Sequence, residues 1–172
     1  MSLIGVIDTE TTGNDVTKDE IIEVAIVFIR DGVIDGSYEQ RIRANKKISA
    51  KALEIHGIAD ADLIGEPTFA EVATDLYKTI KECDVLVGHN ATGFDVPILF
   101  NEFKRVGIFA DFPPCIDTMM KGRGCTADGK VPSLKEYCWA YGIDYDEEEA
   151  HAALYDCEVL AKAFLNLMRM SQ

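Results

Sequence analysis

Two acidic residues close the first apolar segment of the chain. Asp8 and Glu10 follow the apolar run at 3–7 and stand two positions apart. If an extended strand continues through them, both carboxylates lie on one face, about 7 Å apart along the strand, and Thr9 points the other way. Taken alone, such a pair is also typical of a strand end followed by a turn, so metal binding is only one of two interpretations.

Two further acids lie on the apolar faces of predicted helices. Asp95 precedes Leu99 by four residues, and Asp156 precedes Leu160 by four residues, so each acid shares a helix face with core positions. A lone carboxylate is costly to bury unless it becomes protonated or finds a partner. Each of these acids, taken singly, is equally well explained as a first-turn residue that the helix dipole favours.

The four acids together favour a metal site. Carboxylates directed at one interior region repel one another and raise one another's pKa unless cations neutralise them. Hard oxygen ligands of this kind suit Mg²⁺ or Mn²⁺. We therefore expect Asp8, Glu10, Asp95 and Asp156 to converge on a site for two divalent cations.

A histidine precedes the last of these acids. His151 lies five residues before Asp156, and on a regular helix that spacing separates two side chains by about 140°. His151 must therefore lie on the loop that leads into the helix if both residues serve one site. A histidine beside the glutamates at 147–149 is more often a surface residue. At a site, however, its imidazole could accept a proton from water at neutral pH.

The net charge restricts the class of protein. The 172 residues include 17 Lys+Arg and 30 Asp+Glu, which gives a formal net charge of -13 at pH 7. A field of that sign repels nucleic acid and anionic membranes, and this excludes a protein that binds through a basic groove. The acids therefore either solvate the surface, as most of them do, or gather around divalent cations. The length and the 48% hydrophobic content predict a single globular domain over 1–172.

Apolar runs and cysteines indicate the cellular setting. The longest apolar runs are far shorter than the roughly 20 residues that cross a bilayer, and no leader-like segment opens the chain. Five cysteines are scattered without a C-x-x-C pair, which favours free thiols in a reducing compartment. We therefore expect a cytoplasmic protein that does not bind membranes, and the oligomeric state stays open.

The elements that must position the acids change in kind along the chain. Apolar runs bounded by turn residues predict strands, and Asp31-Gly32 predicts the turn of a hairpin. The predicted strands span 3–8, 21–29, 37–43, 84–88 and about 115–117. Capping boxes at Thr68/Glu71 and Ser133/Glu136, together with helical apolar spacing, predict helices. The predicted helices span 49–55, 67–82, 94–106, 133–141 and about 152–170.

The order of these elements predicts an α/β fold. An antiparallel meander in the first third is followed by helices and strands in alternation, and strands linked by helices are parallel. We expect a central mixed five-stranded sheet flanked by helices. The segment 108–131 shows little periodicity and is expected to hold the fifth strand followed by a loop.

The candidate residues fall in three ordered motifs. These are DTETTG at 8–13, GHNATGFD at 88–95 and HAALYD at 151–156. Together they resemble the three exonuclease motifs of the DEDDh family, which includes the proofreading epsilon subunit of bacterial DNA polymerase III. The similarity extends through HGIAD at 56–60 and PTFAEV at 67–72 and covers nearly the whole chain.

The resemblance implies a ribonuclease H-like fold and a metal-dependent 3'-5' exonuclease that releases mononucleotides, with DNA as the expected substrate. An RNA-trimming enzyme similar to ribonuclease T or oligoribonuclease is the alternative, because contacts to a 2'-hydroxyl leave no mark that we can locate in the sequence. A non-catalytic nucleic-acid-binding or scaffold protein agrees less well with intact motif acids. The implied partners are a single-stranded 3' end of DNA or RNA and a DNA polymerase.

The resemblance also assigns roles to residues. Asp8, Glu10 and Asp156 would hold the first metal, Asp8 and waters would hold the second, and Asp95 would complete the site through water. His151 would be the general base that activates the attacking water in a two-metal mechanism. The residues that match positions lining the pocket for the terminal nucleotide are Thr11, Thr12, Gly13, His56 and Asn90.

Two features depart from the family pattern. The second motif has one residue more than usual before Phe94-Asp95, so the inserted Thr92-Gly93 is expected to shift Asp95 or to add a bulge. The chain stops soon after the last predicted helix, from which we expect a free-standing nuclease or a catalytic domain. The cations available for phosphate contacts are Lys46, Lys47, Lys104, Arg105, Lys121 and Arg123. They are few, so electrostatic steering of the substrate should be weak.

Overall fold

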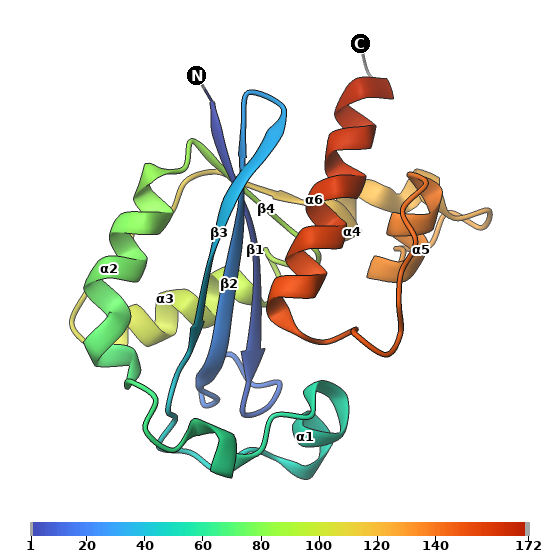
Figure 1. Ribbon diagram of the computed structural model, residues 1–172. Coiled ribbons are helices and arrows are strands. Elements are labelled where there is room, and N and C mark those ends of the chain that lie inside the picture. The colour runs from blue at the N-terminus through green and yellow to red at the C-terminus, as the bar shows by residue number, and fades with distance from the viewer. Residues whose placement is uncertain (1, 171–172) are drawn as a thin grey trace.

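The computed structural model describes residues 2–170, and a five-stranded mixed sheet runs through its centre (Figure 1). The strands are β1 (Leu3–Thr11), β2 (Ile21–Arg30), β3 (Val33–Arg41), β4 (Val85–Gly88) and β5 (Cys115–Asp117). They lie in the order β3-β2-β1-β4-β5. The first three strands pair antiparallel, whereas β4 and β5 run parallel to β1. This arrangement confirms the predicted sheet.

The first strand is longer than predicted and extends beyond the end of its neighbour β4. It pairs with β2 along its whole length, from Leu3 opposite Arg30 to Thr11 opposite Ile21. Its pairing with β4 covers only residues 4–6. Within residues 2–170, no strand pairs with that edge of β1 beyond this point. A side chain from another element can therefore approach the edge where β1 carries its acids.

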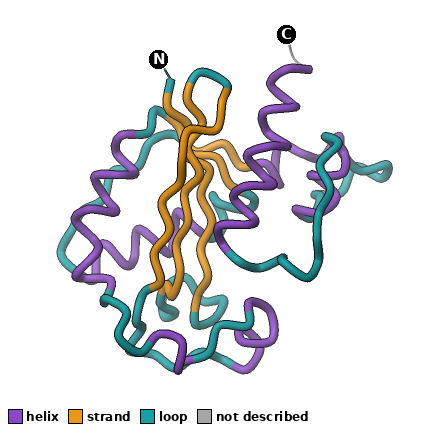
Figure 2. The backbone as a smooth tube through the Cα atoms, in the orientation of Figure 1, coloured by secondary structure: helices purple, strands orange, loops and turns teal. Residues whose placement is uncertain are grey.

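Helices cover both faces of the sheet (Figure 2). The α-helices are α1 (Ala50–His56), α2 (Phe69–Glu82), α3 (Asp95–Arg105), α4 (Thr118–Lys121), α5 (Leu134–Ala140) and α6 (Ala153–Met170). The 3-10 turns are η1 (Asp60–Leu63) and η2 (Gly122–Cys125). All five predicted helices are confirmed. Over the described part of the chain, none of the helices combines the length and the apolar character needed to cross a bilayer.

The loop that the sequence predicted after β5 is in part helical. The helix α4 and the turn η2 follow β5 directly. The carboxylate of Asp117 accepts the backbone N–H groups of Met119 and Met120 and so caps α4. Elements of four residues are too short to show a helical period, which is why the apolar pattern did not predict them.

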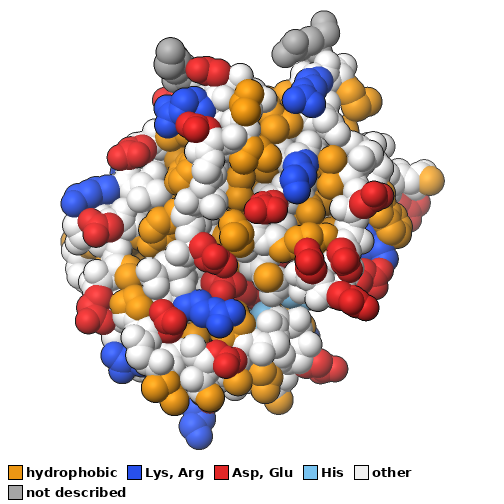
Figure 3. Space-filling view, viewed as in Figure 1, with side chains coloured by type: hydrophobic (Ala, Val, Ile, Leu, Met, Phe, Trp, Pro, Cys, Tyr) orange, Lys and Arg blue, Asp and Glu red, His pale blue; other side chains and the backbone are white. Residues whose placement is uncertain are grey.

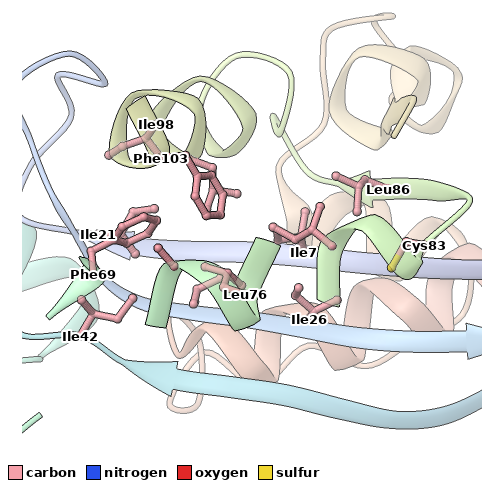
Figure 4. Close-up of a cluster of buried hydrophobic side chains, with 14 of the residues drawn as sticks. Ile7, Ile21, Ile26, Ile42, Phe69, Leu76, Cys83, Leu86, Ile98 and Phe103 are labelled. Atoms are coloured by element: carbon pink, nitrogen blue, oxygen red, sulfur yellow. The ribbon is translucent and has the colours of Figure 1, made fainter. Parts of the chain in front are cut away.

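The two faces of the sheet carry separate cores. Ile7 of β1 packs in the core that α2 and α3 cover (Figure 4). Val6, the preceding residue of β1, packs against α6 on the opposite face. Since side chains alternate along a strand, Asp8 and Glu10 belong to the α6 face and Thr9 belongs to the α3 face.

Candidate metal centre

Three carboxylates from two elements meet near the carboxyl end of β1. Asp8 and Glu10 project from its α6 face, and Asp156 lies in the first turn of α6. One carboxylate oxygen of each residue lies within 4.8 Å of those of the other two. The structure therefore brings together three of the four acids that the sequence singled out.

Burial and mutual repulsion oppose the ionisation of these carboxyl groups. Burial, followed by the charges of neighbouring carboxylates, raises the pKa of Asp8 well above its ordinary value. The same two causes raise the pKa of Glu10 to about 9. Burial also raises the pKa of Asp156. A donor set made only of hard carboxylate oxygens that repel one another fits a divalent cation, because the cation would cancel the repulsion.

Both oxygens of Asp156 are held by the loop that precedes α6. The Tyr145 hydroxyl donates to Oδ1 at 3.2 Å, and the His151 backbone N–H donates to Oδ2 at 3.2 Å. The position of His151 is therefore tied directly to a candidate metal ligand.

The structure places His151 on the loop before α6, as its spacing from Asp156 predicted. Its side chain is exposed, and its backbone adopts the left-handed conformation with φ 65°. This conformation is uncommon for residues with a side chain, costs of the order of 1–3 kcal/mol and clusters at functional sites. The structure thus joins His151 to Asp156 through the backbone, while the imidazole faces solvent.

A further buried acid, Glu23, supports the site from β2. It lies opposite Glu10 in the β1–β2 pairing and is 3% exposed. One carboxylate oxygen accepts the Ala153 N–H at 3.3 Å, and the other accepts Arg41 Nε at 2.9 Å. Glu23 therefore caps the start of α6. Sequence reasoning missed this residue, although a charged residue inside the apolar run 21–29 was a signal that could have found it.

Asp95 approaches β1 from the other face of the sheet. It is the first residue of α3, is 3% exposed, and its Oδ1 accepts the Thr9 hydroxyl at 2.6 Å. It lies outside the group that Asp8, Glu10 and Asp156 form. Burial raises the pKa of Asp95 to about 6, against hydrogen bonds from Thr9. Its charge is nevertheless the largest contribution, after burial, to the raised pKa of Asp8. The longer second motif thus leaves Asp95 hydrogen-bonded to Thr9, the residue that follows Asp8.

Millimolar Mn²⁺ should raise the melting temperature of the protein. An ion that binds only the folded state stabilises it by about 2.7 kcal/mol at a concentration 100-fold above its Kd, or roughly 5–10 °C for a domain of this size. Metal binding also requires deprotonated ligands, so the rise should be larger at pH 8 than at pH 5.5.

The direction of this pH effect follows from the raised carboxyl pKa values. The folded pKa of Glu10 is about 9, against 4.5 for an unperturbed glutamate, so the metal-free protein loses stability as pH rises between these values. Differential scanning fluorimetry with and without Mn²⁺ measures both effects, with Asp8→Asn as the control that should show little rise. Equal rises in the two proteins would contradict binding at this cluster.

The loop after β1 is built around Asp19. Thr12 is fully buried, and its hydroxyl donates to Asp19 Oδ1 at 2.8 Å. A side chain at Gly13 would meet the same carboxylate at 2.7 Å. The Thr11 hydroxyl donates to the Gly13 carbonyl at 2.8 Å. The structure thus places Thr11, Thr12 and Gly13 in one tight turn directly after Glu10, with both threonine hydroxyls bonded inside the protein.

The other two residues predicted to contact a nucleotide are His56, the last residue of α1, and Asn90, in the loop between β4 and α3. His56 Nδ1 accepts the Ile58 N–H at 3.0 Å, and Nε2 lies 3.2 Å from the Thr11 carbonyl. The ring therefore carries its proton on Nε2 and donates it to Thr11. Asn90 adopts a left-handed conformation, φ 66°, between β4 and α3. Their contacts with a nucleotide stay predictions.

An open cleft of about 490 Å³ lies beside His151. Its walls include His56 and His151 together with Glu39, Glu148, Glu149 and Glu158. Figure 3 shows acidic side chains gathered on this part of the surface, with a histidine visible in the hollow. A wall of this charge would repel phosphate directly, so an anionic ligand would need cations at the site.

Two of the predicted phosphate partners form ion pairs within the chain. Arg105 Nη1 contacts Glu102 Oε1 at 2.8 Å and the Asp19 carbonyl at 2.9 Å. Lys46 Nζ lies 2.5 Å from Asp19 Oδ1. Both cations stabilise the loop after β1, and their contacts with phosphate stay predictions.

Known proteins are similar in sequence to nearly the whole chain. The family model RNase_T, described as an exonuclease, matches residues 6–164. The chain is 33% identical over 170 residues to DNA polymerase III subunit epsilon of Buchnera aphidicola subsp. Schizaphis graminum, covering 93% of this chain and 72% of that protein. It is 32% identical over 165 residues to DNA polymerase III PolC-type of Bacillus subtilis, covering 95% and 11%. It is also 32% identical over 165 residues to 3'-5' exonuclease DinG of Staphylococcus aureus, covering 96% of this chain and 18% of that protein. The chain thus spans less than a fifth of the length of these last two relatives.

Solved structures share the fold. Exonuclease X in complex with 5' overhanging duplex DNA superposes with a TM-score of 0.74 at 27% identity, over 98% of this chain and 92% of that one. Escherichia coli Exonuclease I in complex with a dT13 oligonucleotide superposes with a TM-score of 0.82 at 18% identity, over 98% and 41%. The sheet and the helices around it therefore match known architectures.

Proposed function

The chain belongs to the RNase_T exonuclease family, and from this membership we propose that it is a metal-dependent 3'-5' exonuclease. It would hydrolyse the terminal phosphodiester of a nucleic acid and release nucleoside 5'-monophosphates. The membership confirms the resemblance to DEDDh exonucleases, and the likeness to solved exonucleases confirms the predicted ribonuclease H-like fold.

The single observation that carries the proposal is the convergence of Asp8, Glu10 and Asp156 within 4.8 Å of one another. Three carboxylates held this close together destabilise the folded protein unless protons or a cation neutralise them. Two ions, Mg²⁺ or Mn²⁺, fit the donor set. Asp8 would serve both ions, and Asp95 would contribute through water.

The residues around the cluster supply the remaining steps of hydrolysis. Bound divalent ions would polarise the scissile phosphate, lower the pKa of the attacking water and stabilise the leaving 3'-oxygen. His151 would take the proton of that water on its imidazole as the water oxygen bonds to phosphorus. A solvent water would donate a proton to the 3'-oxygen as the phosphorus–oxygen bond breaks. Asp156, which accepts the His151 N–H, would hold the base and the metal ligands in one geometry.

Several observations favour DNA as the substrate. Relatives are named as DNA polymerase III PolC-type and DNA polymerase III subunit epsilon, and Exonuclease X was solved with a DNA duplex carrying an overhang. The acidic cleft and the net charge of -13 suit an enzyme that grips a single-stranded 3' end through its ions.

A DNA polymerase is the proposed protein partner, because one relative is named as a subunit of DNA polymerase III. The five cysteines are free, which supports a reducing cytoplasm as the location.

Incubation with 5'-labelled oligonucleotides tests the proposal. We expect Mg²⁺- or Mn²⁺-dependent shortening of single-stranded DNA and of a 3'-mismatched duplex, one nucleotide at a time, and slower shortening of RNA. The 5'-monophosphate product is identified by mass spectrometry, and EDTA should stop the reaction. Faster shortening of RNA would favour the exoribonuclease alternative, and early release of the 5' label or an absence of cleavage on all substrates would reject the proposal.

A further inference from the structure

Asp117, the last residue of β5, is a buried carboxylate that serves two neighbouring segments. It is 4% exposed. Its Oδ1 accepts the backbone N–H groups of Asn90 at 3.1 Å, Met119 at 3.1 Å and Met120 at 3.2 Å. Its Oδ2 accepts the Thr92 N–H at 3.0 Å and the Thr92 hydroxyl at 2.6 Å. One side chain thus joins the start of α4 to the loop between β4 and α3.

These hydrogen bonds keep the Asp117 carboxylate charged. Burial raises the pKa of Asp117, but hydrogen bonds from the Thr92 hydroxyl and from backbone N–H groups outweigh burial and bring the pKa below its ordinary value. Hydrogen bonds to a charged acceptor are roughly twice as strong as those between neutral groups. The loop is therefore held by a stronger anchor than an ordinary backbone turn would provide.

Gly88, the last residue of β4, leaves no room for a side chain between the anchored loop and β1. A Cβ added at Gly88 would lie 2.5 Å from the Ala91 side chain and 3.0 Å from the Ile7 carbonyl. Asn90 adopts φ 66°, and its carbonyl accepts the N–H groups of Gly93 and Phe94, which lead into α3. Asp95 follows as the first residue of that helix. A displaced loop would therefore move Asp95 relative to β1.

A second set of contacts joins the same two segments. The hydroxyl of Thr118 lies 3.1 Å from the Gly88 carbonyl and 3.0 Å from His89 Nδ1. His89 Nε2 lies 3.0 Å from the Pro132 carbonyl and, because a carbonyl only accepts, must donate to it. The junction of β4 and α3 is thus bonded to the segment that follows β5 at two neighbouring residues.

We propose that Asp117 is a positioning residue for the nuclease reaction, because it fixes the loop that carries Asn90 and delivers Asp95 to Asp8. This inference rests on the proposed function and deepens it. It also explains how the longer second motif is accommodated, since Thr92, in the lengthened stretch between Asn90 and Phe94, makes two of the five hydrogen bonds to Asp117. Asp95 accepts the hydroxyl of Thr9, the residue between Asp8 and Glu10, at 2.6 Å, so its displacement would move a carboxylate away from the part of β1 that carries both ligands.

Asp117→Asn tests this role, since it keeps the shape and removes the charge. We expect the Mn²⁺ concentration at the midpoint of thermal stabilisation to rise about tenfold and kcat at low temperature to fall roughly tenfold or more. Thr92→Val, which loses only the hydroxyl bond, should change both quantities in the same direction and by less. Asp111→Asn, at an acid paired on the surface with Lys81, should leave both unchanged.

A merely structural role gives a different result. In that case Asp117→Asn would have a lower melting temperature than the wild type. The Mn²⁺ midpoint and kcat, both measured well below the melting temperature of the variant, would keep their wild-type values, and this result would overturn the proposal. If Asp117→Asn does not fold, wild-type values in Thr92→Val would overturn it. If the wild-type protein binds Mn²⁺ but cleaves no substrate, the proposed function fails while the Mn²⁺ midpoint still tests Asp117.

Discussion

Replacing Asp8 with asparagine should lower metal-dependent nucleotide release by roughly 10³-fold or more and should raise the melting temperature of the metal-free protein. Asp8 is proposed to bind both ions, and metal ions lower the activation free energy by several kcal/mol. A loss of about 1.4 kcal/mol lowers the rate tenfold. Its carboxyl pKa is raised by burial and by the nearby acids, so the ionised form destabilises the folded protein above its ordinary pKa of 3.8. The amide removes this charge and keeps the shape.

Asp8→Asn should lower activity and raise stability, and few other changes would have both effects. Release of labelled mononucleotide measures the activity, and thermal melting in EDTA measures the stability of the metal-free protein. Asp111→Asn serves as the control, because the Asp111 side chain is 88% exposed and its ion pair with Lys81 contributes little. Retention of more than about a tenth of the wild-type rate would reject the assignment of Asp8. A lowered melting temperature would show that the repulsion argument is wrong.

Replacing His151 with asparagine should slow hydrolysis roughly 10²-fold or more and leave the Mn²⁺-induced stabilisation almost intact. The imidazole is the proposed proton acceptor, so the chemical step loses its base. Asparagine tolerates the left-handed backbone at this position better than alanine does, and it keeps the N–H that donates to Asp156. The variant therefore tests the imidazole alone, because the backbone hydrogen bond from residue 151 to Asp156 is kept.

Single-turnover hydrolysis and a Mn²⁺ melting series measure the two properties of His151→Asn. Asp144→Asn is the matched control on the same loop, since Asp144 is exposed and does not line the cleft, and it should behave as wild type. Wild-type rates in His151→Asn would contradict the role of general base. Loss of the Mn²⁺ effect would indicate that His151 acts chiefly by orienting Asp156.

The order and kind of the elements could be predicted because their signals are local. Glu71 Oε2 accepts the Thr68 N–H at 2.7 Å, and Glu136 Oε2 accepts the Ser133 N–H at 2.8 Å, as the two capping boxes predicted. Gly57 ends α1 with φ 70°, a conformation that glycine adopts at low cost. Signals of this kind lie within a few residues and need no knowledge of the rest of the fold.

The candidate site could be predicted only in part, because its support comes from distant segments. The apolar spacing identified Asp95, but its approach from the α3 face depends on β4 being shorter than β1. Glu23 caps α6 from 130 residues away, and Asp117 reaches Thr92 across 25 residues. Local periodicity contains no information about such pairs, since only the folded sheet brings them together.

Diffraction from crystals soaked in Mn²⁺, recorded at a wavelength where manganese scatters anomalously, would show whether the three carboxylates bind a divalent cation. We expect anomalous peaks among the carboxylates of Asp8, Glu10 and Asp156, and their loss in Asp8→Asn crystals soaked in the same way. Peaks confined to exposed acids, or no peak at this cluster at saturating Mn²⁺, would contradict this expectation.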